Sequence, residues 1–257
     1  MKLSQVAIQL YTLRDFIKTP ADIAATLKKV REIGYQAVQV SGMGPIPEEE
    51  LVKILNDNGL VCAATHENGN TIRKDPQAVS ARLSKLGTKY TAYPYPADVK
   101  FDDEASVASL IADLDKAGEV LASAGQVLTY HNHATEFARV GGKTLLEKIY
   151  DETNPKFLQG EIDTFWVQYG GGDNVAWCKK LTGRLPLLHA KDFAFPVGAD
   201  RGKFAEVGYG NLDWKAIVPA AEAAGMEWFI IEQDTCPGDP FDSIRMSFEY
   251  TRDNLVS

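Results

Sequence analysis

Short apolar runs rich in β-branched residues alternate along the chain with longer segments in which apolar residues recur every three or four positions. The short runs indicate buried strands, and the longer segments indicate amphipathic helices. In segment 20–33, for example, Ile23, Leu27 and Val30 share one helical face after Thr19 and a proline, a common helix start. This alternation occurs eight times. Strands are expected at 6–11, 36–40, 61–65, 90–95, 127–131, 157–163, 185–191 and 227–233, and the helices that follow them at 20–33, 47–55, 75–86, 102–124, 144–152, 173–182, 213–224 and 240–255.

The repeated strand–helix unit predicts the fold. Strands joined by crossover helices must run parallel, and eight of them close most economically into a barrel. Glycines such as Gly34 and Gly125 end several helices just before the next strand, where a left-handed residue is favoured. An open doubly wound sheet is the alternative, but no G-x-G-x-x-G motif follows the first strand. We expect an α/β fold, a single-domain (β/α)8 TIM barrel over residues 1–257, with its one long irregular stretch at 192–212.

The composition indicates a globular protein and excludes several classes of partner. Of the 257 residues, 45% are hydrophobic and 24% charged, which suffices for a full core. The 27 Lys and Arg against 35 Asp and Glu give a net charge of −8, which opposes binding to nucleic acid or anionic membranes. The three cysteines are odd in number and far apart, as in a reducing compartment. Without a signal-peptide pattern or an apolar run long enough to span a membrane, the sequence predicts a cytoplasmic protein.

Four polar residues interrupt the last four predicted strands near their C-terminal ends, where TIM barrels carry their active sites. They are His131, Asp163, His189 and Glu232. Charge in an apolar strand needs a partner or a metal. The mixed nitrogen and oxygen donors predict one divalent ion, Mn²⁺, Co²⁺, Fe²⁺, Zn²⁺ or Mg²⁺ rather than Ca²⁺, with His133 as the alternative to His131. Taken singly, Asp163 could instead cap a helix, His189 could be a core histidine, and Glu232 could pair with Lys191.

Other residues near the strand ends are candidates for catalysis and substrate binding. Glu161 precedes Asp163 by two positions and therefore lies on the same strand face one layer deeper, where it could contact a ligand histidine or Lys191. Each candidate also has a purely structural reading as a loop residue, an ion pair or packing. The catalytic candidates are Glu232, Glu136, His133 and Lys191; the substrate-binding candidates are His66, Glu136, Trp166, Lys191 and Trp214.

Several segments together resemble a known family. QLYTLRD, YHNHATEF, EIDTFW, LLHAKD, and VGYGNLDW with AAGMEWFIIEQD, in this order, are similar to the xylose isomerase-like TIM-barrel superfamily and its sugar phosphate isomerases/epimerases. The resemblance spans essentially the whole chain. It implies one divalent metal held at strands five to eight, usually by Glu, Asp, His and Glu, of which Asp163, His189 and Glu232 match the last three. It also implies that Glu136 contacts the substrate.

The chain departs from the family pattern at two positions. His131 replaces the metal-binding glutamate of strand five, and Trp166 stands where epimerases carry a substrate-binding histidine. The resemblance implies a metal-dependent sugar isomerase or epimerase that abstracts a proton next to the carbonyl of a sugar or polyol derivative. Epimerases of the family use a pair of glutamates, on strands five and eight, as acid and base on the two sides of the substrate carbon, and only Glu232 of that pair remains here. The alternative is therefore a lyase or dehydratase acting on keto-sugars or inososes.

Two further function classes compete with these enzymes. A non-catalytic sugar-binding protein stays open. A three-zinc apurinic endonuclease is disfavoured, because it needs many more ligands than four histidines allow and because the net charge of −8 opposes DNA binding. The expected partner is a small sugar or polyol, with no nucleic acid and no membrane, and a homo-oligomer is compatible with the sequence.

Overall fold

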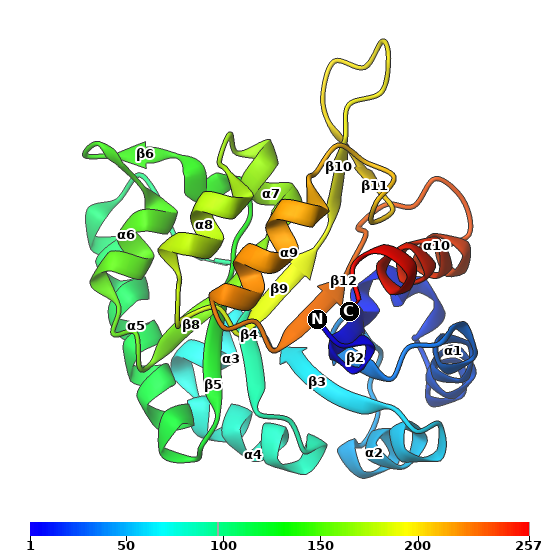
Figure 1. Ribbon diagram of the computed structural model, residues 1–257. Coiled ribbons are helices and arrows are strands. Elements are labelled where there is room, and N and C mark those ends of the chain that lie inside the picture. The colour runs from blue at the N-terminus through cyan, green and yellow to red at the C-terminus, as the bar shows by residue number, and fades with distance from the viewer. Residues whose placement is uncertain (97, 257) are drawn as a thin grey trace.

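Eight parallel strands close into a barrel in the computed structural model, which describes residues 1–96 and 98–256 (Figure 1). Each strand pairs with its neighbours around the barrel, and the last strand returns to the first. The predicted (β/α)8 TIM barrel is therefore confirmed. Around the barrel the strands are β1 (Val6–Gln9), β12 (Trp228–Ile231), β9 (Leu187–Ala190), β8 (Leu158–Asp163), β5 (Val127–His131), β4 (Tyr90–Tyr93), β3 (Val61–His66) and β2 (Ala37–Val40).

The predicted helices surround this barrel (Figure 1). Within the first of them, the Thr19 side chain accepts a hydrogen bond from the Asp22 backbone N–H, and the Asp22 carboxylate accepts one from Thr19, which forms a capping box. In residues 1–96 and 98–256, no helix combines the length and apolar character needed to cross a bilayer. The helices are α1 (Pro20–Ile33), α2 (Glu48–Asp57), α4 (Pro76–Leu86), α5 (Glu104–Ser123), α6 (Leu145–Glu152), α8 (Asn174–Lys180), α9 (Trp214–Ala223) and α10 (Pro240–Asn254).

The structure adds short elements that the hydrophobic pattern does not predict, since most of them lie in the connections at the C-terminal ends of the strands. The prediction that residues 192–212 are irregular is wrong, because this stretch contains an antiparallel hairpin that rises away from the barrel in Figure 1. The added elements are η1 (Leu3–Gln5), η2 (Leu10–Phe16), α3 (Gly69–Lys74), η3 (Thr135–Phe137), β6 (Arg139–Val140), β7 (Lys143–Thr144), α7 (Thr164–Tyr169), β10 (Asp192–Ala194) and β11 (Lys203–Ala205).

One buried carboxylate organises the connection from β9 to α9. Asp192 accepts hydrogen bonds from the backbone N–H groups of Gly208, Gly210 and Leu212, and the Trp214 indole N–H donates to its Oδ2 at 2.7 Å. These donors come from positions 16 to 22 residues further along the chain. Because charge-assisted hydrogen bonds are stronger than neutral ones, Asp192 holds the base of the hairpin in place.

The strand register brings the candidate residues together. Asp163 of β8 pairs with His189 of β9, and His131 of β5 pairs with Glu161 of β8. Glu232 follows directly after β12, the next strand around the barrel from β9. Parallel strands present their C-terminal ends at one end of the barrel. These side chains therefore converge without any contribution from the long loops.

We predict that Asp192→Asn loosens this connection. The amide nitrogen cannot accept a hydrogen bond, so donors now paired with one carboxylate oxygen lose their partner, and the free energy of unfolding should fall by about 2–3 kcal/mol. Urea unfolding measures this loss, and limited proteolysis should detect new cleavage within 195–202. Asp200→Asn, an exposed position of the same loop, is the matched control. Unchanged unfolding and no new cleavage in Asp192→Asn would contradict the assigned role.

Candidate active site

A fully buried carboxylate forms the floor of the site. Glu161 lies inside the barrel with no exposed surface. Its Oε2 accepts a hydrogen bond from Gln39 Nε2 at 2.9 Å, and its Oε1 lies 2.5 Å from His66 Nε2 and 2.9 Å from His189 Nε2. Burial alone raises the pKa of Glu161, but the two histidines outweigh it and hold the pKa well below its usual range. The expectation that Glu161 contacts a candidate ligand histidine is met, whereas Lys191 lies elsewhere.

Directly above this floor, four donor atoms come together. His131 Nε2, Asp163 Oδ2, His189 Nδ1 and Glu232 Oε2 belong to buried residues whose ligand atoms all lie within 4.8 Å of one another. His131 Nε2 is 3.1 Å from Asp163 Oδ2, and His189 Nδ1 is 2.9 Å from Glu232 Oε2. The four predicted metal ligands thus form one cluster, which we call the donor cluster.

Hydrogen bonds on the far side of each imidazole orient the two histidines. His131 Nδ1 lies 3.2 Å from the Pro94 carbonyl oxygen and donates to it, which leaves the lone pair of Nε2 facing the cluster. His189 Nε2 contacts Gln39 Oε1 at 2.6 Å as well as Glu161, which leaves its Nδ1 facing Glu232. Metal-binding histidines in proteins are held in this way by partners of their second nitrogen.

The donor cluster fits a divalent ion on two grounds. His189 Nδ1 is buried and forms no hydrogen bond with any described residue, although Glu232 Oε2, itself paired with the Lys191 ammonium, lies 2.9 Å away. Buried polar atoms without hydrogen bonds are rare, and an ion bound to His189 Nδ1 would satisfy it. In addition, the ammonium of Lys191 lies within 3.1 Å of three carboxylates, Asp163, Glu232 and Asp234, so negative charge is in excess.

A cavity of about 560 Å³ opens above the donor cluster. His66, His133 and Lys191, which were predicted from the sequence, line it together with two of the cluster residues. Burial lowers the pKa values of His66 and His133, the latter to about 2. The full lining is Tyr11, Arg14, Ser41, His66, Glu67, Asn68, Pro94, Tyr95, His131, His133, Lys191, Glu232, Asp234 and Thr235.

Comparison with known proteins fits this arrangement. The sequence pattern of the xylose isomerase-like TIM barrel family matches residues 27–253. The chain belongs to this family. An inosose dehydratase of Mesomycoplasma hyopneumoniae is 25% identical, and the match covers 98% of this chain and 95% of that protein.

Two solved structures show the same fold. A sugar phosphate isomerase/epimerase of Parabacteroides distasonis superposes with a TM-score of 0.82 at 22% identity, covering 98% of this chain and 99% of that one. The IolI protein, solved with a bound zinc atom, superposes with a TM-score of 0.73 at 16% identity and covers 97% of each chain. The inosose dehydratase relative agrees with the expectation that this family member is an enzyme.

The structure corrects the predicted role of Glu136. Its carboxylate is fully buried and accepts hydrogen bonds from the Tyr130 hydroxyl, the Thr135 hydroxyl and the backbone N–H of His133. It does not line the cavity above the donor cluster. Glu136 therefore positions the segment that carries His133, and neither the predicted proton transfer nor the predicted substrate contact fits its location.

The two candidate tryptophans lie in different environments. Trp214 is buried beside Phe229, and its indole N–H donates a hydrogen bond to Asp192. It borders neither of the two cavities at this end of the barrel, so the predicted substrate contact does not fit its position. Trp166 lines a second cavity that adjoins the first, and its ring centroid is 5.5 Å from that of His133. Its position remains compatible with the predicted substrate contact.

Asp234 and Arg14 are among the lining residues that the sequence pattern did not single out. Asp234 follows Glu232 by two positions, so strand alternation could have placed it on the same face. Arg14 donates from Nη2 to the Asp234 backbone oxygen at 2.9 Å and stacks over the Tyr11 ring. This contact joins segments 220 residues apart, and no local pattern predicts it.

We predict that the donor cluster binds one divalent ion per chain and that His131 rather than His133 is a ligand. His131→Ala should weaken zinc or manganese binding by about 100-fold or more, because it removes one of four donors. His133→Ala, two residues away, is the matched control and should retain the metal. Metal analysis after dialysis and calorimetric titration provide the measurement. A protein that holds no metal, or that loses it only in His133→Ala, would contradict this assignment.

Proposed function

We propose that the protein is a metal-dependent enzyme that takes a proton from the carbon next to the carbonyl of a sugar or polyol derivative and completes a β-elimination. The observation that carries this proposal is the buried donor cluster beneath a cavity whose two sides hold unlike groups. The inosose dehydratase relative supports elimination over simple isomerisation.

The proposed metal ligands are His131, Asp163, His189 and Glu232. A divalent ion held there would polarise the carbonyl oxygen of the substrate and stabilise the negative charge that develops on it. Support comes from the buried His189 Nδ1, which lacks a hydrogen-bond partner among the described residues, and from the excess of carboxylates around Lys191. The zinc of the IolI structure makes Zn²⁺ the first ion to test, followed by Mn²⁺, Co²⁺, Fe²⁺ and Mg²⁺.

Glu232 is the proposed base. Its Oε2 faces His189 and Lys191, whereas no described residue contributes a hydrogen bond to Oε1, and the side chain lines the cavity. The Lys191 ammonium, 2.9 Å away, together with His189, keeps Glu232 ionised and its pKa below the usual range despite burial. An ionised carboxylate with one free oxygen at the cavity wall is suited to accept the proton.

Lys191 is better suited to hold charge than to act as a base. Burial alone would lower the pKa of Lys191, but the carboxylates of Asp163, Glu232 and Asp234 raise it above its usual value. The side chain is only 1% exposed and spans these three groups at 2.9 to 3.1 Å. We assign Lys191 to fixing these carboxylates and to donating hydrogen bonds at the cavity wall.

The side of the barrel that faces Glu232 carries imidazoles. In the order of eight strands, β4 is opposite β12, and its neighbours β3 and β5 lead to His66 and His133. An epimerase needs an equivalent base on each side of the reacting carbon. Here Glu136 is turned away and the pKa of His133 is too low for it to donate a proton, so the proton that Glu232 accepts would be returned to the departing hydroxyl, which leaves as water while a carbon–carbon double bond forms. A single carboxylate faced by imidazoles therefore suits elimination better than epimerisation.

Hydrogen exchange provides the test. Metal-loaded protein is incubated in D₂O with inososes, 3-keto-sugars and free ketoses. We expect deuterium at the carbon next to the carbonyl together with loss of water from an inosose or keto-sugar. Glu232→Gln should abolish both, since it removes the base and weakens a ligand, whereas Glu49→Gln on the exposed face of α2 should change neither.

Other outcomes would each overturn the proposal. Clean interconversion of ketose epimers without loss of water would establish the isomerase or epimerase reading instead. Saturable binding of these compounds without any exchange would establish a sugar-binding protein. Exchange that persists in Glu232→Gln would remove Glu232 from the reaction.

A further inference from the structure

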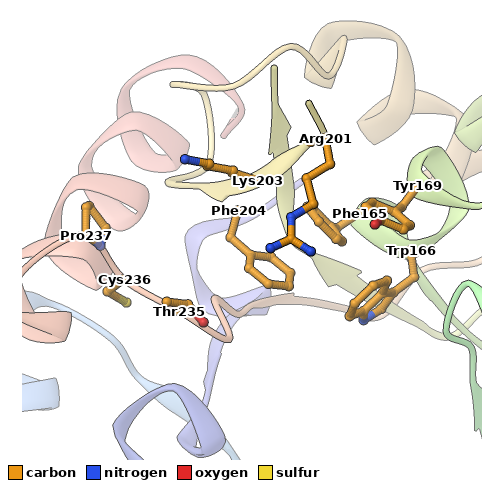
Figure 2. Close-up of a pocket in the computed structure, with 10 residues that line it drawn as sticks. Phe165, Trp166, Tyr169, Arg201, Lys203, Phe204, Thr235, Cys236 and Pro237 are labelled. Atoms are coloured by element: carbon orange, nitrogen blue, oxygen red, sulfur yellow. The ribbon is translucent and has the colours of Figure 1, made fainter. Parts of the chain in front are cut away.

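A second cavity of about 540 Å³ lies beside the first at the same end of the barrel (Figure 2). Its walls come from α7, from the β10–β11 hairpin and from the segment after β12. Neither the donor cluster nor the proposed reaction uses it. The lining residues with a ring or a charge are Phe165, Trp166, Tyr169, Arg201, Lys203 and Phe204.

The two cavities lie next to each other. Thr235 lines both of them. Lys191, which contacts the donor cluster, places its Nζ 5.7 Å from the ring centroids of both Trp166 and Phe204. The aromatic wall therefore begins where the charged cluster ends, and one molecule could occupy both spaces.

The second cavity has a built aromatic wall. The rings of Phe165 and Phe204 stack with centroids 4.0 Å apart, and Trp166 stands edge-on to Phe165 at 4.9 Å. The hairpin is packed tightly at this point, since a Cβ at Gly202 would lie 2.1 Å from the Phe193 ring. The indole nitrogen of Trp166 is buried and lacks a hydrogen-bond partner among the described residues.

An arginine without a partner completes this cavity. Arg201 forms no hydrogen bond or ion pair with any residue in the described part of the chain. Figure 2 shows its side chain extending down from the hairpin toward the aromatic residues of this cavity. In a chain of net charge −8, an exposed guanidinium at the edge of an aromatic cavity is suited to an anion carried on a planar group.

We propose that the second cavity binds a planar aromatic group with an acidic substituent, as the second part of a substrate whose sugar or polyol part lies over the donor cluster. This rests on the function proposed above. Stacking against Phe204 and Trp166 accounts for the planar group, and Arg201 accounts for the acidic substituent. An inosose without such a substituent would leave this space unused.

The test measures binding of small probes by calorimetry with the metal-loaded protein. Benzenesulfonate is the planar anion; benzyl alcohol lacks the charge, and cyclohexanesulfonate lacks the aromatic ring. We expect benzenesulfonate to bind most tightly, and Arg201→Met and Phe204→Ala each to weaken it by about tenfold. Arg201→Met should leave benzyl alcohol unchanged. Arg245→Met, an exposed arginine of α10 that lines neither cavity, is the matched control and should change nothing.

Three results would overturn the inference. The first is the absence of saturable benzenesulfonate binding, and the second is benzenesulfonate binding that neither substitution weakens. The third is that methyl β-glucoside binds more tightly than benzenesulfonate and that Phe204→Ala weakens its binding, which would make the cavity a sugar subsite. Repeating the titration with Glu232→Gln separates this inference from the proposed reaction. Benzenesulfonate should bind that variant equally well, even if no substrate tested undergoes exchange.

Discussion

The buried charge of Glu161 is the constraint on which the site depends. An ionised carboxylate inside a barrel is unstable unless donors surround it. Gln39 from β2, His66 from β3 and His189 from β9 supply those donors, so one side chain links four strands across the barrel interior. The same contacts fix the ring of His189, which then has only its Nδ1 free for the donor cluster. The orientation of His189 in the donor cluster therefore follows from the buried charge of Glu161 beneath it.

Several residues in this site combine a structural and a chemical role. Asp163 uses Oδ1 to accept a hydrogen bond from the Trp166 backbone N–H at the start of α7, and it turns Oδ2 toward His131. Glu232 likewise pairs with Lys191 and still lines the cavity. The helix cap and the ion pair that the sequence offered as alternatives to metal binding are therefore both present. The cap uses Oδ1 of Asp163 and leaves Oδ2 to the donor cluster, whereas Lys191 and the donor cluster share Oε2 of Glu232.

The parts of the structure that follow a regular pattern could be predicted from the sequence, and the parts held by isolated side chains could not. Periodicity and capping residues located all eight strand–helix units, and the geometry of parallel strands then required residues at 131, 163, 189 and 232 to meet. The β10–β11 hairpin has no such pattern, since it depends on Asp192 and on donors far along the chain. Glu136 could not be placed for a related reason: its orientation is set by the Tyr130 and Thr135 hydroxyls.

The charge count around Lys191 explains why His131 in place of the family's usual glutamate is consistent with a functional site. Asp163, Glu232 and Asp234 surround one ammonium, which leaves two formal negative charges if all three are ionised. A divalent ion would balance that excess, whereas a fourth carboxylate at position 131 would leave one negative charge uncompensated in a buried region. Burial and the charge of Glu232 raise the pKa of Asp234, the direction expected where negative charge is in excess. A neutral imidazole at 131 keeps a metal donor without adding to that charge. It also removes the second carboxylate base, so the same substitution that keeps the cluster electrostatically balanced favours a reaction with one base over one with two.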